Sequence, residues 1–127
     1  MNLHFQKHYS IEEARALLPE VRQWLTKIQQ VRRSLESVNQ RLTPLMKVGD
    51  DIGGSNVNKM VRLVADLNET LAEFHTREIQ LKDIDRGLLD FPAIIGGREV
   101  FLCWEQDEDD IEFWHDIDAG YAGREKL

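Results

Sequence analysis

The side chains most able to do chemistry together are an aspartate, a cysteine and a histidine: Asp90, Cys103 and His115. These residue types are common ligands of transition metals, and a thiolate paired with an imidazolium is a nucleophile. A structural interpretation competes with both. In it Cys103 is a small buried hydrophobe, His115 hydrogen-bonds to a carboxylate or carbonyl, and Asp90 caps a turn. We expect this structural role, because apolar neighbours and a carboxylate would keep the Cys103 thiol neutral.

Whether these three residues meet depends on strand pairing, because side chains alternate across a strand. The glycine pair at 96–97 is typical of a two-residue hairpin, since glycine tolerates positive φ, and it would pair Asp90 with Cys103. A second hairpin over the acidic residues 106–110, expected as a solvated turn, would place His115 diagonally beside that pair. Diagonal neighbours lie about 7–8 Å apart at Cα. The sequence therefore predicts that all three share one face of a sheet.

Other charged residues could extend this cluster. Glu13 would join it if the first helix crosses the sheet nearby, so Asp90, Cys103, His115 and Glu13 form the candidate ligand or metal cluster. Arg98 and Arg124 are candidate contacts for an anion by bidentate hydrogen bonding, although they could equally neutralise carboxylates of the chain itself. We assign no catalytic residue and expect no cofactor, since no cofactor motif is present.

The elements that must position these residues can be read from the periodicity. Ser10 and Glu13 form a capping box at the start of a helix. Apolar residues then recur at spacings of three and four over 14–45 and again over 57–74, which predicts a helical hairpin over about 10–78. Because the second helix is the shorter, the first part of helix one is left to pack on the sheet. His4 and His8 precede the cap, and we expect that segment to be frayed.

Extended patterns replace the helical ones after residue 78. The segments 79–84, 88–95, 98–105 and 111–117 predict an antiparallel β-meander of three to four strands over about 79–118, followed by a loose tail over 119–127. The fold class predicted for residues 1–127 is therefore a single α+β domain. Trp104 and Trp114 are predicted as anchors of the meander, buried on the same face against helix one or a dimer partner. Both sheet faces are rich in large apolar groups, so helix one can cover one face. The other must meet a partner subunit, a ligand or the tail.

Composition limits the setting of the protein. The 127 residues carry 16 basic and 23 acidic side chains, a net charge of −7, which argues against nucleic acid as a partner. A single cysteine excludes an intramolecular disulfide and suits a reducing compartment. No apolar run reaches membrane-spanning length, and the first residues do not form a secretory signal. We therefore expect a cytoplasmic protein that does not enter a membrane.

Five motifs carry a family resemblance: S-I-E-E-A-R-A-L-L-P at 10–19, D-x-G-L-x-D-F-P at 85–92, G-R-E-V-x-L-C-W at 97–104, W-H at 114–115 and G-x-x-G-R at 120–124. By these motifs the chain resembles the uncharacterised bacterial family catalogued as domain of unknown function 2203. The resemblance implies a small stand-alone prokaryotic protein. It implies no reaction and no ligand.

Two classes of function remain open. The sequence favours a homo-oligomeric interaction or adaptor protein without catalytic activity, most simply a dimer. The reason is that apolar residues such as Val61 and Ala65 lie beside the main helical seam, so the apolar arc is wider than one helix can cover. The alternative is a protein that binds a small molecule or a metal, or an enzyme, with its site where the N-terminal end of helix one crosses the meander.

Overall fold

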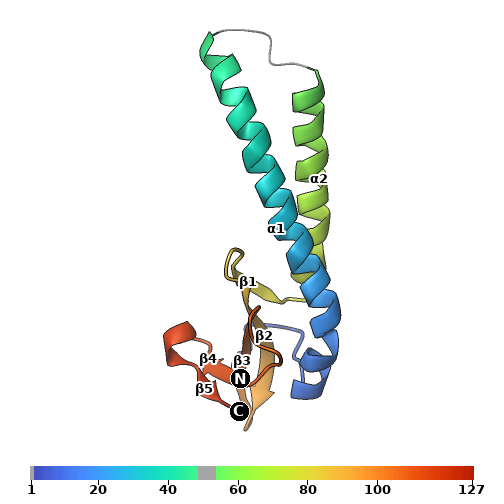
Figure 1. The fold of residues 1–127 in the computed structure, drawn as a ribbon. Coiled ribbons are helices and arrows are strands. Elements are labelled where there is room, and N and C mark those ends of the chain that lie inside the picture. The colour runs from blue at the N-terminus through green and yellow to red at the C-terminus, as the bar shows by residue number, and fades with distance from the viewer. Residues whose placement is uncertain (1, 49–53) are drawn as a thin grey trace.

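The computed structural model describes residues 2–48 and 54–127, which form a helical hairpin followed by an antiparallel sheet (Figure 1). The helices are α1 (Ile11–Val48) and α2 (Ser55–His75). The strands are β1 (Gln80–Asp83), β2 (Leu88–Ile95), β3 (Arg98–Glu105), β4 (Phe113–Asp116) and β5 (Glu125–Lys126), with a short 3₁₀ helix, η1 (Tyr121–Gly123), before the last. The strands lie in the sheet in sequence order. The predicted α+β class and meander are confirmed.

The sheet has five strands rather than the predicted three to four, because the C-terminal tail is not loose. Its strand β5 pairs with β4, Trp114 facing Glu125, and the backbone amide of Leu127 donates to the carbonyl of Glu112 at 2.8 Å. A strand of two residues leaves no periodicity to recognise, so only its pairing with β4 defines it.

The two halves of α1 have different neighbours. Its first half packs on the sheet, while its second half runs beside α2 and projects away from the sheet as an arm (Figure 1). The predicted capping box starts the helix: the Ser10 amide donates to the Glu13 carboxylate at 3.1 Å, and the Glu13 amide donates to the Ser10 hydroxyl at 3.0 Å. At the junction, Trp24 of α1 meets Phe74 of α2 edge to face at 5.6 Å. Among the described residues, neither helix is both long and apolar enough to cross a membrane.

One face of the sheet packs against α1 to make the core. The fully or nearly fully buried members of this core include Ala14, Val21, Leu25 and Ile28 from α1, and Leu89, Phe91, Val100, Leu102 and Trp104 from the sheet. Trp104 is buried as predicted, and its indole N–H donates to the Glu108 carbonyl at 3.0 Å. Trp114 packs against the same core but is only half-buried by its own chain, so its burial against a dimer partner stays a prediction. It lies on the short strand β4, with the Arg98 guanidinium over its ring.

The strand register agrees with the prediction. Asp90 faces Cys103 across β2 and β3, and Phe101 faces His115 across β3 and β4. The hairpin between β2 and β3 turns at Gly96 and Gly97 with φ of 59° and 76°, in the left-handed region that glycine adopts without strain.

The acidic loop at 106–110 is not the solvated turn that its composition predicts. The Glu108 carboxylate accepts from both terminal nitrogens of Arg124, at 3.1 and 2.8 Å, and from the amide of Glu105 at 2.8 Å. Arg22 of α1 donates to the carbonyls of Gln106 and Glu108 at 3.1 and 2.8 Å. The loop is therefore docked onto α1 and the tail, because its carbonyls and carboxylates have donors on both sides.

Candidate functional site

The second face of the sheet, turned away from α1, carries the chemistry. It is covered by the two ends of the chain rather than by a helix. From the C-terminal side comes a segment whose residues line a cavity over this face: Ile117, Ala119, Gly120 and Tyr121. From the N-terminal side comes the segment of residues 2–9. Within it, the ring of Phe5 packs edge to face on the ring of Phe101, with the centroids 5.4 Å apart. Of the three covers left open for this face, the C-terminal tail supplies one part, and the N-terminal segment supplies another.

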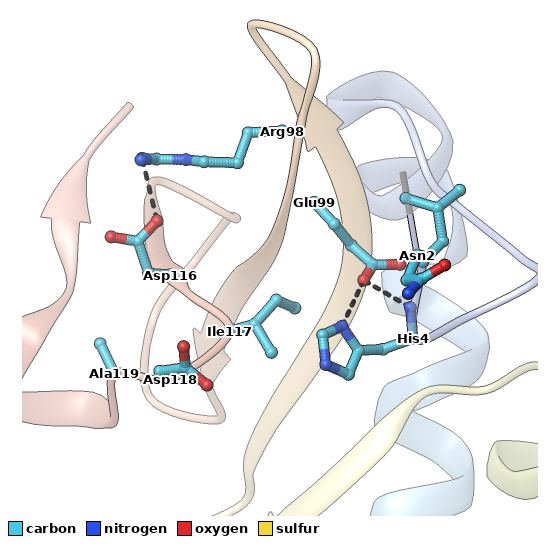
Figure 2. Close-up of a pocket in the computed structure, with 9 residues that line it drawn as sticks. Asn2, His4, Arg98, Glu99, Asp116, Ile117, Asp118 and Ala119 are labelled. Atoms are coloured by element: carbon cyan, nitrogen blue, oxygen red, sulfur yellow. Dashed lines mark hydrogen bonds and ion pairs between the residues drawn. The ribbon is translucent and has the colours of Figure 1, made fainter.

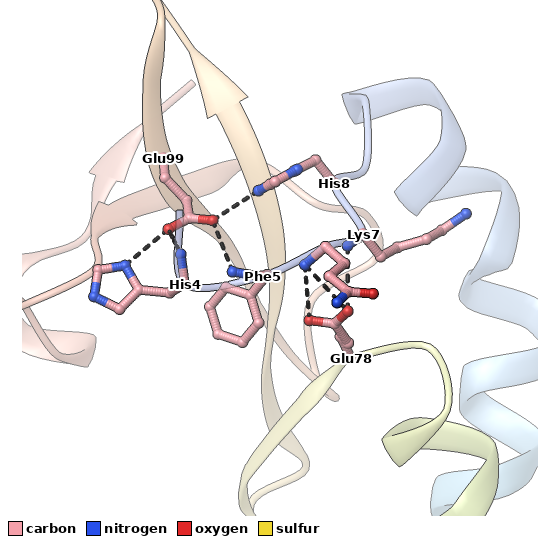
Figure 3. A network of polar contacts seen from close by, with 7 residues as sticks. His4, Phe5, Lys7, His8, Glu78 and Glu99 are labelled. Carbon is pink, nitrogen blue, oxygen red and sulfur yellow. Dashed lines mark hydrogen bonds and ion pairs between the residues drawn. The ribbon is translucent and has the colours of Figure 1, made fainter. Parts of the chain in front are cut away.

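The N-terminal segment is held by two carboxylates, so the prediction that it is frayed is wrong. The amides of His4 and Phe5 donate to Glu99 at 2.7 and 3.1 Å, and the amides of the next two residues donate to Glu78 at 3.2–3.3 Å (Figure 3). The imidazoles of His4 and His8 contact the two oxygens of Glu99 at 2.9 and 2.7 Å. Four consecutive backbone amides and two side chains thus fix residues 4–8.

Glu99 is buried, with 6% of its side chain exposed. Burial alone would raise the pKa of this carboxyl, but hydrogen bonds from His8, His4 and Phe5 outweigh burial and lower its pKa to about 2. Sequence reasoning missed Glu99. The signal available was a carboxylate inside an otherwise apolar strand, since such a group requires donors from elsewhere in the chain.

Asp90, Cys103 and His115 do meet, as the register predicts. A carboxylate oxygen of Asp90, the sulfur of Cys103 and a ring nitrogen of His115 all lie within 4.8 Å of one another, and all three residues are buried. The Asp90 Oδ1 and His115 Nε2 atoms are 3.0 Å apart. Phe101 packs against the imidazole, with ring centroids 5.4 Å apart. The site is therefore a compact, buried group of one oxygen, one sulfur and one nitrogen donor beside an aromatic ring.

The hydrogen bonds of His115 determine where its proton lies. The Nδ1 atom is 2.8 Å from the backbone carbonyl of Asp116, which can only accept, so Nδ1 carries a hydrogen. The Nε2 atom then faces Asp90 either as a second N–H against a carboxylate or as a lone pair against a protonated carboxyl. In both cases Asp90 and His115 share one proton.

Burial controls the titration of the other two groups. It raises the pKa of Asp90, against the opposing charge and hydrogen bond of His115. It also raises the pKa of the Cys103 thiol to about 12, assisted by the negative charge of Asp90 and opposed by Arg124. Cys103 is thus a neutral thiol near pH 7 even with Arg124 beside it, and a thiolate–imidazolium nucleophile is not favoured.

A cavity of about 240 Å³ opens onto this group. Its lining includes the three cluster residues, apolar side chains and two polar ones from the rim: Lys82, Leu88, Asp90, Phe101, Cys103, His115, Ile117, Ala119, Gly120 and Tyr121. A larger hollow of about 600 Å³ lies beside the N-terminal segment (Figure 2). Four of its five ionisable groups already pair with each other, His4 with Glu99 and Arg98 with Asp116, so the smaller cavity is the better candidate site.

Of the three other predicted site residues, Glu13 and Arg98 lie elsewhere, while Arg124 lies beside Cys103. Glu13 is not part of the cluster, because its carboxylate completes the capping box at the start of α1, and α1 packs on the opposite face of the sheet. The site is therefore not where α1 crosses the meander. Arg98 forms an ion pair with Asp116 at 2.9 Å, and Arg124 is held by Glu108. Both arginines therefore neutralise carboxylates of the chain, which is the alternative to contacting a bound anion.

Comparison with known proteins gives a family and no closer relative. No curated protein and no solved structure matches the chain. A family model described as "Uncharacterized conserved protein (DUF2203)" matches residues 7–127. This stretch contains all three members of the buried cluster and the strands that carry them. The chain belongs to the DUF2203 family.

Proposed function

We propose that the protein binds a divalent transition-metal ion of the zinc class through Asp90, Cys103 and His115. The observation that carries the proposal is the convergence of three different ligand atoms within 4.8 Å in a buried site. A purely structural role explains this arrangement less well. A buried ion pair is usually no more stabilising than well-packed apolar side chains of similar volume, and this site has a thiol beside the pair.

The orientation of His115 supports this function. A histidine that binds a metal through one ring nitrogen almost always donates its other N–H to a carbonyl or carboxylate, which fixes the tautomer. His115 has such a contact from Nδ1 to the Asp116 carbonyl, and its Nε2 faces Oδ1 of Asp90, one of the other two ligands. Once the shared proton leaves, Nε2 is a lone-pair donor without any rotation of the ring.

The ligand set indicates which metal. Thiolate and imidazole favour zinc and neighbouring transition metals, while calcium and magnesium take oxygen ligands. Three protein ligands are one fewer than a closed structural zinc site has, and an open fourth position is typical of zinc sites that bind a further ligand. The cavity beside the cluster, with Lys82 and Tyr121 at its rim, provides room for that ligand.

Proton competition sets the conditions for binding. At neutral pH a metal must displace the thiol proton of Cys103 and the proton shared by Asp90 and His115, which makes two protons per ion. The raised pKa of Cys103 weakens binding, but a dication beside the sulfur favours the thiolate strongly. Affinity should therefore rise about 100-fold per pH unit near neutrality, as two displaced protons require.

The test is the metal content of protein purified without a histidine tag. We expect about one zinc-class ion per chain, and binding of cobalt(II) with a thiolate-to-metal charge-transfer absorption. Asp90→Asn and Cys103→Ser are nearly isosteric and should lose the ion while circular dichroism shows a retained fold. His75→Ala, which removes an exposed histidine on α2, is the matched control and should keep it. A folded wild-type protein that takes up neither zinc nor cobalt would overturn the proposal.

A further inference from the structure

We infer that the exposed face of α2 binds the same face of a second copy of this chain, with the two helices antiparallel. This inference is independent of the metal site, since α2 belongs to the arm and the cluster lies on the far face of the sheet. It names the partner of the helical arm, a second copy of the chain, and the antiparallel arrangement of the two α2 helices, and both can be tested.

The face in question is an uncharged stripe along α2. Its members recur at helical spacing and fall on one side of the helix: Val57, Val61, Val64, Ala65, Asn68 and Ala72. Val61 and Val64 are 63% and 41% exposed, which is high for large apolar side chains. The structure describes every residue of α2, and all charged residues of this helix lie outside the stripe.

The contact of α2 with α1 buries few side chains of α2, so this contact alone does not account for the stability of α2. In a helix of 21 residues, the only buried side chains are Thr70 and Phe74, at the end next to the sheet. Leu63 and Leu67, which lie on the α1 side, are only half-buried. Helices in water depend on tertiary packing more than on propensity, so the arm gains from a further helix laid along α2.

Charge placement identifies the occupant as a second copy. Arg62 and Glu69 are two turns apart and flank the stripe on the same side. In an antiparallel pair the same flanks of two helices face each other, so a crossing centred between Ala65 and Asp66 sets each Arg62 opposite the Glu69 of the other copy. Among the described residues, neither side chain forms an ion pair within its own chain. Ala65, at the centre of the crossing, is small enough to permit close approach of the helices.

The first experiment measures the mass in solution by light scattering across a concentration series. We expect the wild-type chain to be a dimer at micromolar concentration. Val61→Glu should make it a monomer, because it would set a carboxylate in the apolar contact, and circular dichroism checks that the helices persist. Lys59→Glu, an exposed change on α2 outside the stripe, is the matched control and should remain dimeric. A monomeric wild-type chain, or a dimer that tolerates Val61→Glu, would overturn the inference.

The second experiment tests the antiparallel register through charge reversal. Arg62→Glu and Glu69→Arg should each raise the dissociation constant of the dimer roughly tenfold, because two attractive pairs become repulsive at once. The double variant Arg62→Glu/Glu69→Arg should return it to near the wild-type value, since the pairs are restored with reversed sign. If the double variant is as weak as the two single variants combined, the two residues do not face each other and the proposed register is wrong.

Discussion

Nε2 of His115 lies 3.0 Å from Oδ1 of Asp90, and 3% of each side chain is exposed. A titratable pair that is so deeply buried has strong consequences for stability. Removing one partner leaves the other in an apolar environment without compensation, which costs more than the pair itself contributes. The same pair is also the part of the site that must exchange a proton when a metal binds.

His115→Ala should therefore destabilise the metal-free protein by about 3–5 kcal/mol, the cost of leaving one member of a buried pair without its partner. Urea denaturation in the presence of a chelator measures the free energy of unfolding. His75→Ala removes an exposed histidine and should change it by less than about 0.5 kcal/mol. A loss of less than about 1 kcal/mol in His115→Ala would mean that water replaces the imidazole, and that the site is more open than the buried pair indicates.

The thiol of Cys103 should be almost unreactive in the metal-free native protein. With a pKa of about 12 its thiolate fraction at pH 7 is lower than that of a free cysteine, with a pKa of about 8.5, by roughly three orders of magnitude. Alkylation should be slow in native protein and fast only after unfolding. A fast native phase with an apparent pKa below the free-cysteine value, abolished by His115→Ala, would instead indicate a thiolate–imidazolium pair and an enzyme.

Glu99 should make the fold sensitive to acid. Its pKa in the folded protein is about 2 against an ordinary value of 4.5, so its stabilising effect is complete above about pH 4.5 and is lost as the pH falls through about 2. The wild-type free energy of unfolding should thus fall more steeply between pH 5 and pH 2 than that of Glu99→Gln. Parallel curves for the two proteins would show that Glu99 is not a charged anchor of residues 4–8.

The two tryptophans of the meander should differ in their effect on stability. Trp104→Ala empties a fully buried site and should cost about 3–5 kcal/mol. Trp114→Ala should cost clearly less, because this side chain is half-buried and retains contact with solvent. Equal losses in chemical denaturation would mean that Trp114 has an additional buried contact, which an interface between copies could supply.

Much of the sheet could be predicted because its register depends on local signals. The glycine pair at 96–97 defines the turn, and alternation along β2 and β3 then fixes which residues share a face with Asp90. Which of the two faces α1 covers could not be predicted, since both are apolar. That choice determined whether Glu13 could reach the cluster, and the prediction for Glu13 was wrong for this reason.

The covering of the second face could not be predicted either, because it depends on contacts between distant segments without periodicity. Residues 4–8 have no helical or extended pattern, and the carboxylates of Glu78 and Glu99, together with the contact of Phe5 on Phe101, hold them. Likewise the acidic loop at 106–110 is indistinguishable from a solvated turn until Arg22 and Arg124 are placed beside it. Polar contacts between distant segments leave little trace in a single sequence.

The most direct test of the metal site is calorimetric titration of the metal-free protein with zinc at pH 7, in two buffers with different enthalpies of ionisation. The difference between the buffers gives the number of protons released. For the wild-type protein we expect about one ion bound per chain and about two protons released per ion. Any residual binding by Cys103→Ser should release only about one proton, because this variant retains only the proton shared by Asp90 and His115. Absence of binding by the folded wild-type protein, or stoichiometric binding without proton release, would contradict a site built from these three residues.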